Sequence, residues 1–442
     1  MKFAVLSSFL GAFFSLLLIS SSVMAQSAPE SEPEAETQDS DEVFVISEVE
    51  INGLGRTKEF VVWREFDFEL HSPTTRVVLE ESAQRLRNMG LFAKVEYTLE
   101  PKGDSHKIIY DVLERWTILP VVKASSGGGI NQLIVGLYDI NVLGRYLEMG
   151  GQYERLGPTN SGVVWFRDPR LFDQRLWFSA DVWHVNRIYT LYDNDGEEEG
   201  GFLLQRNMLA LALEKEVVWW FRFGGRIQVV QDQTSLNLIE DDIRQLQARR
   251  GLPEDTLRIQ PGLTFQLGRL NQDNYLVEGA QLNLRLDGTD TILGSTFSFG
   301  SIESDLVLAK TLPFKSTIAF RWLVGISSTE AETHFYYIGG FDRVRGFLDA
   351  RFRGPAHTTA NLEFRIPSLD TSWLVLQHVG FVDVTSVGQG ASDFADITAA
   401  SAGAGIRLIS PRIYRLTLRL DYAASLVNSG DSAISFGVQQ FF

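Results

Sequence analysis

The side chains best suited to catalysis do not form a recognisable site in this sequence. It contains no cysteine, no G-x-S-x-G, no H-E-x-x-H and no Walker loop. The six histidines share no metal-ligand spacing: His71, His106, His184, His334, His357 and His378. We therefore expect no enzyme activity, no cofactor and no metal centre.

An acidic run at Glu197–Glu199 has two interpretations. Neighbouring carboxylates can bind a cation, whereas a run of like charges in a loop is normally solvated. Because the run lies within Asp193–Gly200, between two strand-like segments, we favour a solvated outer loop. The stretch Glu240–Arg250, in another long loop, has the composition of a short helix.

The composition favours a membrane protein over a nucleic-acid-binding one. The formal net charge is −16, and an acidic surface repels phosphates, so no nucleic-acid partner is expected. Aromatic residues make up 12% of the chain, with 30 Phe and 9 Trp, as a barrel with aromatic girdles requires. A length of 442 residues predicts two or more domains.

Residues 1–25 have the form of a secretory signal peptide. Lys2 precedes an apolar run, Phe3–Ile19, and Val23-Met24-Ala25 is a cleavage site of the A-x-A type. The alternative is an uncleaved anchor, but the run is barely long enough to span a membrane. No later segment approaches 18 apolar residues, so any further span must use strands. Residues 26–42 are acidic and rich in small residues, which predicts a disordered linker.

Residues 43–116 are predicted to form one small α+β domain with the order β-α-α-β-β. Thr57 is a fair N-cap for the first helix, and Ser72-Pro73 lies near the start of the second. Asn88-Met89-Gly90 closes that second helix. The alternating segments that predict strands are Val43–Ile51, Ala93–Leu99 and Lys107–Leu113.

From residue 117 to residue 442 the sequence predicts a transmembrane β-barrel of about 16 antiparallel strands. Segments of about ten residues alternate with period two between turn signals. In Tyr414–Tyr422 the apolar side chains point one way, and Arg415, Thr417, Arg419 and Asp421 point the other. A strand of a soluble sheet has the same alternation, but this row ends in tyrosine at both ends, as at membrane interfaces. Short links alternate with long ones such as 232–256 and 328–357, which predicts both termini on the periplasmic side.

Several motifs carry a resemblance to a known family. Gly53-Leu54-Gly55-Arg56-Thr57 and Asn88-Met89-Gly90-Leu91-Phe92 lie where a POTRA domain has its turns, and Asn141–Arg145 matches the first periplasmic turn of the barrel. Gly339-Gly340 leads into Val344-Arg345-Gly346-Phe347, which matches the VRGF motif between strands eleven and twelve. The chain thus resembles the BamA/TamA-like outer-membrane assembly-factor superfamily, in which POTRA domains precede a sixteen-stranded bacterial surface antigen barrel. The resemblance covers nearly all of the mature chain.

The resemblance implies a loop anchor inside the barrel. A barrel of about sixteen strands has an aqueous lumen that a long loop can fill. Alternation places Glu363 in the lumen, and Asp383 lies on the following strand. The resemblance implies that Arg345 pairs with both carboxylates, for which a guanidinium is well suited. The alternative is that all three are solvated charges.

The two ends of the barrel sequence suggest a weak seam. The chain ends on Phe442, as the targeting signal of such barrels does, although Gln440 departs from the usual apolar residue. Gly437 near the end, and Ser125–Gly129 in the first strand, weaken strand pairing. These glycines equally suit tight turns and close packing, so both interpretations stay open.

The resemblance implies a protein-assembly factor in the bacterial outer membrane, with its POTRA domain in the periplasm. Its partners would be unfolded outer-membrane or secreted client proteins and outer-membrane lipids, with periplasmic chaperones or lipoproteins as accessory partners. The POTRA domain would receive the client by strand addition, and we expect Ala93–Leu99 to be the receiving edge. The alternatives are a two-partner secretion transporter for one passenger, a passive pore or structural barrel, and a lipid-related role. A single POTRA domain is unusual for a two-partner secretion transporter, which usually carries two, and for a BamA-like insertase, which normally carries several.

Overall fold

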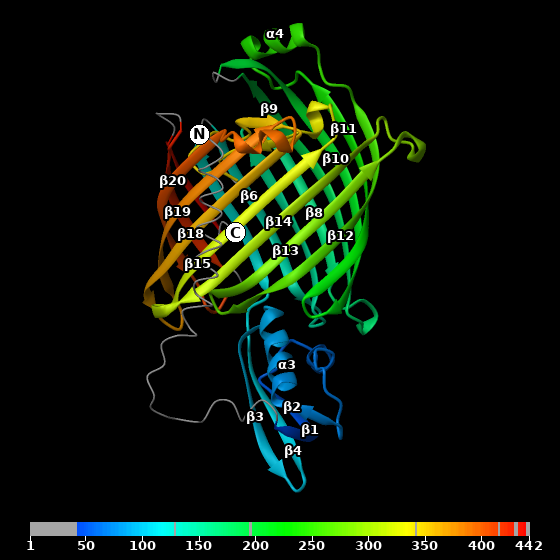
Figure 1. Cartoon of the computed structure of the whole chain (residues 1–442), viewed down its shortest axis with the longest axis vertical. Coiled ribbons are helices and arrows are strands. Elements are labelled where there is room, and N and C mark those ends of the chain that lie inside the picture. Colours follow the sequence, from blue (N-terminus) through cyan, green and yellow to red (C-terminus); the bar gives the residue numbers. More distant parts are fainter. Residues whose placement is uncertain are drawn as a thin grey trace.

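The structure is a computed structural model that describes residues 42–127, 130–193, 197–340, 343–413, 416–427 and 432–438. It consists of a large β-barrel and a small domain at one end of it (Figure 1). The predicted signal peptide (1–25), nearly all of the predicted linker (26–42) and Phe442 lie outside the described residues. Across the described ranges, no helix is long and apolar enough to cross a membrane.

The small domain is a four-stranded sheet with two helices. The strands have the order β2-β1-β4-β3, with β1 parallel to β4 and β3 antiparallel to it. Leu79 and Leu86 of the longer helix are fully buried against Ile108 and Tyr110 of the sheet, because one side of that helix is apolar. The predicted α+β fold is confirmed. The elements are β1 (Val43–Asn52), α2 (Glu59–Trp63), β2 (Pro73–Thr75), α3 (Arg76–Asn88), β3 (Phe92–Lys102) and β4 (Ser105–Glu114).

One local prediction in this domain is wrong and another was incomplete. Thr57 does not cap α2: Lys58 occupies the cap position, and the Thr57 hydroxyl instead accepts a hydrogen bond from Asn141 Nδ2 of the barrel at 2.9 Å. Pro73 opens a short strand, β2, which pairs with β1 before the helix begins at Arg76. Both differences come from partners distant in sequence, which local helix signals do not contain.

Glycine is required at two of the three glycine positions in the predicted turns of the small domain. Gly53 has φ +90°, and an ideal Cβ there would lie 2.0 Å from the Val112 carbonyl oxygen of β4. Gly90 follows α3 with φ +76°, the left-handed conformation that commonly ends a helix. Gly55 does not have a positive φ, and an ideal Cβ there would lie 3.4 Å from the Glu114 carboxylate.

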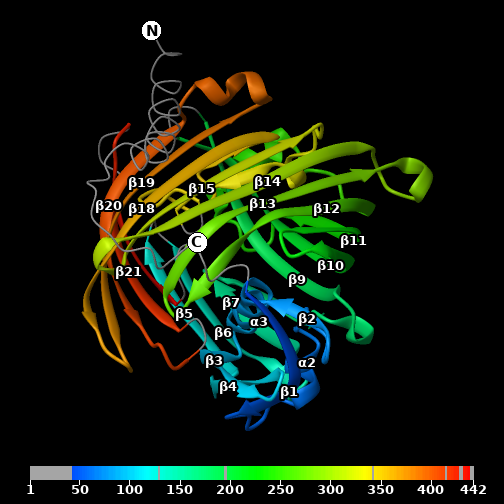
Figure 2. The ribbon, with the colours of Figure 1, turned by 60° about the horizontal axis from the view of Figure 1, so that its bottom comes forward.

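The barrel is a single sheet of sixteen antiparallel strands that is nearly closed, as predicted (Figure 2). Strands that follow one another in sequence are neighbours in the sheet, and β15 is followed by β18 because the loop between them forms its own small hairpin. The strands are β5 (Ile118–Gly127), β6 (Ile130–Val142), β7 (Leu147–Leu156), β8 (Thr159–Asp168), β9 (Leu176–Tyr192), β10 (Glu198–Val218), β11 (Phe221–Ser235), β12 (Thr256–Asp273), β13 (Leu276–Thr289), β14 (Phe299–Leu312), β15 (Ser316–Ser327), β18 (Ala356–Asp370), β19 (Val375–Gly388), β20 (Ala399–Ile409), β21 (Thr417–Ser425) and β22 (Ser432–Val438).

The strands carry apolar side chains outward and polar side chains inward. On β18, Glu363 and Arg365 are buried, whereas Phe364 and Ile366 are 42% and 43% exposed on the outer surface. The alternation follows from the period of two in a strand, and it places the lipid-facing row outside and the charged row in the lumen.

The connections differ between the two ends of the barrel. At the end next to the small domain they are short, for example 143–146, 219–220 and 313–315. At the other end they include 236–255, which contains α4 (Asp241–Arg250), and 328–355. This pattern confirms the predicted alternation of short and long links and the helix expected in Glu240–Arg250.

Candidate functional site

The longest outer loop, residues 328–355, forms a hairpin of β16 (Tyr336–Ile338) with β17 (Phe352–Gly354). The VRGF motif lies in the segment that connects these two strands. The Val344 amide donates a hydrogen bond to the Gly339 carbonyl at 3.1 Å. An ideal Cβ on Gly340 would lie 2.0 Å from the Phe347 carbonyl oxygen. The glycine pair before the motif therefore allows the two limbs of the loop to approach each other.

Arg345, at the tip of this loop, lies against the barrel wall and is 1% exposed. Its Nε and Nη2 donate to the two carboxylate oxygens of Asp383 on β19 at 2.7 and 2.8 Å, and its backbone amide donates to the same carboxylate at 3.1 Å. Its Nη1 donates to Glu363 Oε1 on β18 at 2.5 Å. Both carboxylates are fully buried. The structure thus brings together the three residues that the resemblance grouped.

Apolar contacts surround the tip. The guanidinium carbon of Arg345 lies 3.5 Å from the centroid of the Phe381 ring, a close cation–π contact. Gly346 has φ +96°, and an ideal Cβ there would lie 3.2 Å from Ala423 Cβ on β21, so this position also requires glycine. Val344 and Phe347 are buried in a small apolar cluster with Ile338 and Ala399.

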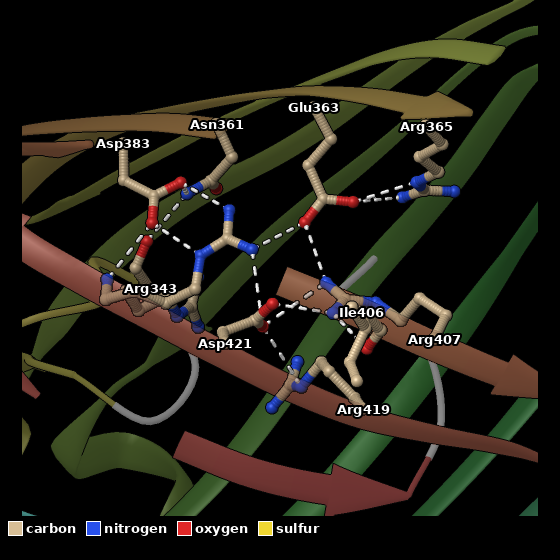
Figure 3. A network of polar contacts seen from close by, with 10 residues as sticks. Arg343, Asn361, Glu363, Arg365, Asp383, Ile406, Arg407, Arg419 and Asp421 are labelled. Atoms are coloured by element: carbon tan, nitrogen blue, oxygen red, sulfur yellow. Dashed lines mark hydrogen bonds and ion pairs between the residues drawn. The ribbon is translucent and has the colours of Figure 1, made fainter. Parts of the chain in front are cut away.

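The charged cluster extends beyond the predicted residues (Figure 3). Asp421 on β21 lies 3.7 Å from Arg345 Nη1 and accepts hydrogen bonds from Arg407 at 2.6 and 3.2 Å. Glu363 also pairs with Arg365 at 2.7 Å. Asn361 Nδ2 donates to Asp383 Oδ1 and to the Arg343 carbonyl, at 2.8 Å each. The tip is therefore bound to three strands, β18, β19 and β21.

Sequence reasoning missed the roles of Asp421, Arg407 and Phe381 in this cluster. The alternation in 414–422 did place Asp421 on the polar side of its strand, which was the available signal. Nothing in that pattern says which lumen residue meets a loop that is 76 residues away in sequence (345 to 421).

The first and last barrel strands, β5 and β22, lie side by side at the two ends of the sheet order. An ideal Cβ on the buried Gly437 would lie 3.6 Å from Lys123 Cε on β5 and 3.3 Å from Arg419 Nη2. Between the described parts of these two strands there is no backbone ladder, whereas every other neighbouring pair of barrel strands has one. Gly128 and Gly129, for which weak strand pairing and tight turns or close packing both stayed open, lie outside the described residues.

The small domain is joined to the barrel through the two turns that matched family motifs. The Lys58 amide donates to the Gly144 carbonyl at 2.8 Å. Gly144 has φ +72°, and an ideal Cβ there would lie 2.1 Å from the Arg56 carbonyl oxygen, so the two turns are in direct contact. The side chains of Arg56 and Asp139 form an ion pair across the same junction.

Ion pairs extend this junction along the short barrel turns. Glu65, 1% exposed, accepts two hydrogen bonds from Arg170 in the turn between β8 and β9, at 2.7 and 2.6 Å. Arg85 of α3 pairs with Asp67 at 2.6 Å and with Glu216 of β10 at 3.1 Å. The junction therefore combines arginine–carboxylate pairs with an apolar contact, in which Ile140 of β6 packs in the core of the small domain.

Glu114 shapes the junction from within the small domain. The backbone amides of Arg56 and Thr57 each donate to its carboxylate at 2.9 Å. Partial burial by itself raises the pKa of Glu114, but these hydrogen bonds outweigh the burial and hold its pKa below the ordinary value. The ionised carboxylate thus orders the turn that contacts the barrel.

Comparisons with known proteins bear on the whole chain. The sequence profile of the Omp85 superfamily domain matches residues 141–442, and that of the POTRA domain, described as a surface antigen variable number repeat, matches residues 44–115. No curated protein sequence matches the chain.

Three solved structures are similar in fold. BamA from Haemophilus ducreyi lacking POTRA domains 1–3 aligns with a TM-score of 0.55 at 16% identity, over 89% of this chain and 84% of that one. CdiB from Acinetobacter baumannii aligns with a TM-score of 0.58 at 14% identity, over 90% of this chain and 74% of that one. CdiB from Escherichia coli aligns with a TM-score of 0.57 at 11% identity, over 99% of this chain and 98% of that one. Since the superfamily profile covers more than half of the chain and the fold agrees, this protein belongs to the Omp85 superfamily of outer-membrane barrels and carries one recognised POTRA domain.

Proposed function

We propose that this protein inserts or translocates client proteins at the bacterial outer membrane, with the POTRA domain in the periplasm as the receiving module. The observation that carries the proposal is the free edge of the POTRA sheet. β3 (Phe92–Lys102) is the terminal strand of that sheet, and only β4 pairs with it among the described residues. An exposed strand edge binds an extended peptide by adding it as a further strand.

The position of β3 supports transfer to the barrel. Its neighbour β4 runs into the seam strand β5 after only 115–117, so an added client strand would lie close to the end of β5. The Arg115 amide donates to the Leu91 carbonyl at 2.8 Å, which ties this connection to the start of β3. A client could then pass to the seam beside β22 or enter the lumen.

The anchored loop argues against a passive pore. A tip bound to three strands by buried charges occupies the lumen, whereas an open pore needs no such cluster. Arg345, with Glu363 and Asp383, is proposed to be the anchor that keeps the loop inside. Accessory chaperones or lipoproteins would reach the protein through the POTRA domain.

Dedicated secretion of one passenger is the second candidate. CdiB structures are among the similar folds, and one of them aligns over nearly the whole of both chains. At 11% identity this likeness extends to the fold alone. The two candidates differ in the number of clients, which an experiment can count.

The test combines client counting with cross-linking. After depletion, the outer membrane and the medium are analysed by quantitative proteomics, with complementation by wild type or Arg345→Ala. A photo-crosslinking residue at Glu96 on β3 captures the client, and one at Glu80, an exposed glutamate on α3, is the matched control.

The outcomes separate the candidates. Loss of several barrel proteins, together with cross-links from position 96 but not from position 80, supports assembly. Loss of one secreted protein points to dedicated secretion. Unchanged fractions without cross-links would overturn both and leave a pore or a lipid-related role.

A further inference from the structure

A second buried charge cluster lies on the barrel wall away from Arg345. Asp232 on β11 is fully buried and accepts hydrogen bonds from Arg206 Nε and Nη2 on β10 at 2.6 and 2.8 Å. Arg258 on β12, 5% exposed, donates to the same carboxylate at 3.2 Å. One carboxylate thus joins two arginines from the strands on either side of it.

This cluster contacts the loop that carries the VRGF motif. Arg206 Nη2 also donates to the Thr333 carbonyl at 2.8 Å. The next residue, His334, has its Nε2 3.6 Å from Asp232, and its ring stacks on Phe297 and Phe299 at centroid distances of 5.1 and 5.8 Å. The part of the loop before the tip, residues 328–338 (the descending limb), is therefore fixed to the wall by a charged and an aromatic contact.

Neighbouring contacts extend the same attachment. The Tyr337 ring stacks on Tyr189 of β9 with a centroid distance of 3.9 Å, beside the buried Leu191 and Phe202. On the returning limb, Arg353 donates to the Tyr192 carbonyl at 3.1 Å. Both limbs are thus bound to the wall formed by β9–β12.

The two attachments are on different parts of the barrel wall. In the sheet order, five strands lie between β11, which carries Asp232, and β19, which carries Asp383: β12, β13, β14, β15 and β18. The loop does not fill the lumen between these attachments. A cavity of about 510 Å³ remains, which is lined by Tyr336 and Arg343 of the loop and by Arg226 and Arg285 of the wall. A loop that leaves such space needs a contact at each end to stay across the lumen.

We propose that Asp232 is a positioning residue that fixes the descending limb of loop 328–355. The loop is then attached to two separate parts of the barrel wall, and each attachment can be released without the other. Releasing Arg345 alone would free only the tip. The inference deepens the proposed function and rests on it for its consequence: a client that clears the lumen must displace both attachments. The competing interpretation is that Asp232 only balances two wall arginines.

The test uses single cysteines, because the chain contains none. Thr333→Cys reports on the limb and Val344→Cys on the tip; the native side chains are 3% and 0% exposed. The rate of labelling by a charged maleimide is measured on the full-length protein in outer membranes. Each reporter is combined with Asp232→Asn, Arg345→Ala or Asp305→Asn. Asp305 is the matched control, because it forms a two-bonded pair with Arg321 on the wall.

We expect Asp232→Asn to raise labelling at position 333 at least tenfold and to change labelling at position 344 less than twofold. Arg345→Ala should give the reverse, and Asp305→Asn should change neither. Unchanged labelling at 333 in Asp232→Asn, or equal release of both positions, would overturn the proposal.

A second variant, on the loop and not on the wall, keeps the test decisive if Asp232→Asn does not fold. His334→Ala leaves the wall cluster intact and should also expose position 333, while heat-modifiable electrophoretic mobility verifies the folded barrel. If Asp232→Asn does not fold and His334→Ala leaves position 333 protected, the proposal is wrong. Since labelling needs no client, these results stand apart from the depletion and cross-linking results that decide the proposed function.

Discussion

The loop tip and the POTRA junction are both attached to the barrel by arginine–carboxylate pairs, but their burial differs. Arg345, Glu363 and Asp383 are at most 1% exposed. At the junction, Arg56 is 41% exposed and Asp173, which pairs with Arg64, is 67% exposed. Exposed pairs contribute little because water and salt screen them, whereas a buried pair that loses one partner leaves an uncompensated charge.

The comparison teaches that the same chemistry can make one attachment firm and the other adjustable. The loop tip is expected to leave its site rarely, and its attachment should be insensitive to salt. The POTRA junction combines largely buried pairs, Glu65 with Arg170 and Arg85 with Glu216, with more exposed and therefore screened pairs. Its orientation relative to the barrel should therefore respond to ionic strength.

The largest expected effect comes from removing the charge at the loop tip. Arg345→Ala leaves Asp383 without its bidentate partner, and we expect the tip attachment to lose about 3–5 kcal/mol. Arg345→Lys should lose nearly as much, since an ammonium cannot form the fork to Asp383 and reach Glu363 together. Hydrogen exchange of 343–347 measures the loss. Slow exchange in Arg345→Ala would show that the apolar contacts alone fix the tip.

A smaller effect is expected at the buried pair of the junction. Glu65→Ala removes two charge-assisted hydrogen bonds from Arg170, worth about 1.5–3 kcal/mol, while Glu216 stays 3.6 Å from Arg170. Cross-linking between the POTRA domain and the β8–β9 turn measures the docking. Unchanged docking would mean that the other contacts, among them the two glycine-containing turns, are sufficient to set the junction.

Gly144→Ala tests those turns directly. The substitution adds a Cβ 2.1 Å from the Arg56 carbonyl at a positive φ, and we expect about 1–3 kcal/mol of weakened docking. Gly157→Ala is the matched control: it also has a positive φ, but no atom lies within 4 Å of its ideal Cβ. Equal effects of the two variants would show that backbone strain, and not contact with Arg56, is responsible.

The turn that contacts the barrel should also respond to pH. Because the pKa of Glu114 is lowered in the folded domain, its contribution is present above the unfolded value of about 4.3 and is lost as pH falls through the folded value. We expect docking to be constant from pH 7 to pH 5 and weaker below pH 4. Glu114→Gln should remove this part of the pH dependence. A parallel acid loss in Glu114→Gln would assign the effect to other carboxylates.

The smallest effect is expected at the pair of Arg64 with Asp173, whose carboxylate is 67% exposed. Asp173→Asn should change docking by less than about 1 kcal/mol, and 0.5 M salt should mask the change. A loss of docking as large as that of Glu65→Ala would contradict the expectation that the more buried ion pairs of the junction are the stronger ones.

Much of the architecture is predictable from the sequence because it depends on local periodicity. The sixteen barrel strands follow from alternation, which strand geometry converts directly into an inner and an outer face. The small domain follows from one apolar helix face and three alternating strands, and β2 escaped prediction because it is three residues long. The VRGF residues were found by resemblance to a family motif.

What the sequence determined by itself is therefore the barrel, the small domain before it and the polar face of each strand. Only the tertiary structure decided which lumen charges meet: Arg345 with Asp421, and Arg206 with both Asp232 and the Thr333 carbonyl of the loop. It also turned Thr57 from a predicted helix cap into a partner of Asn141. The physical reason is that alternation fixes a side chain's face but not its neighbours, which depend on strand register, barrel closure and the path of a long loop.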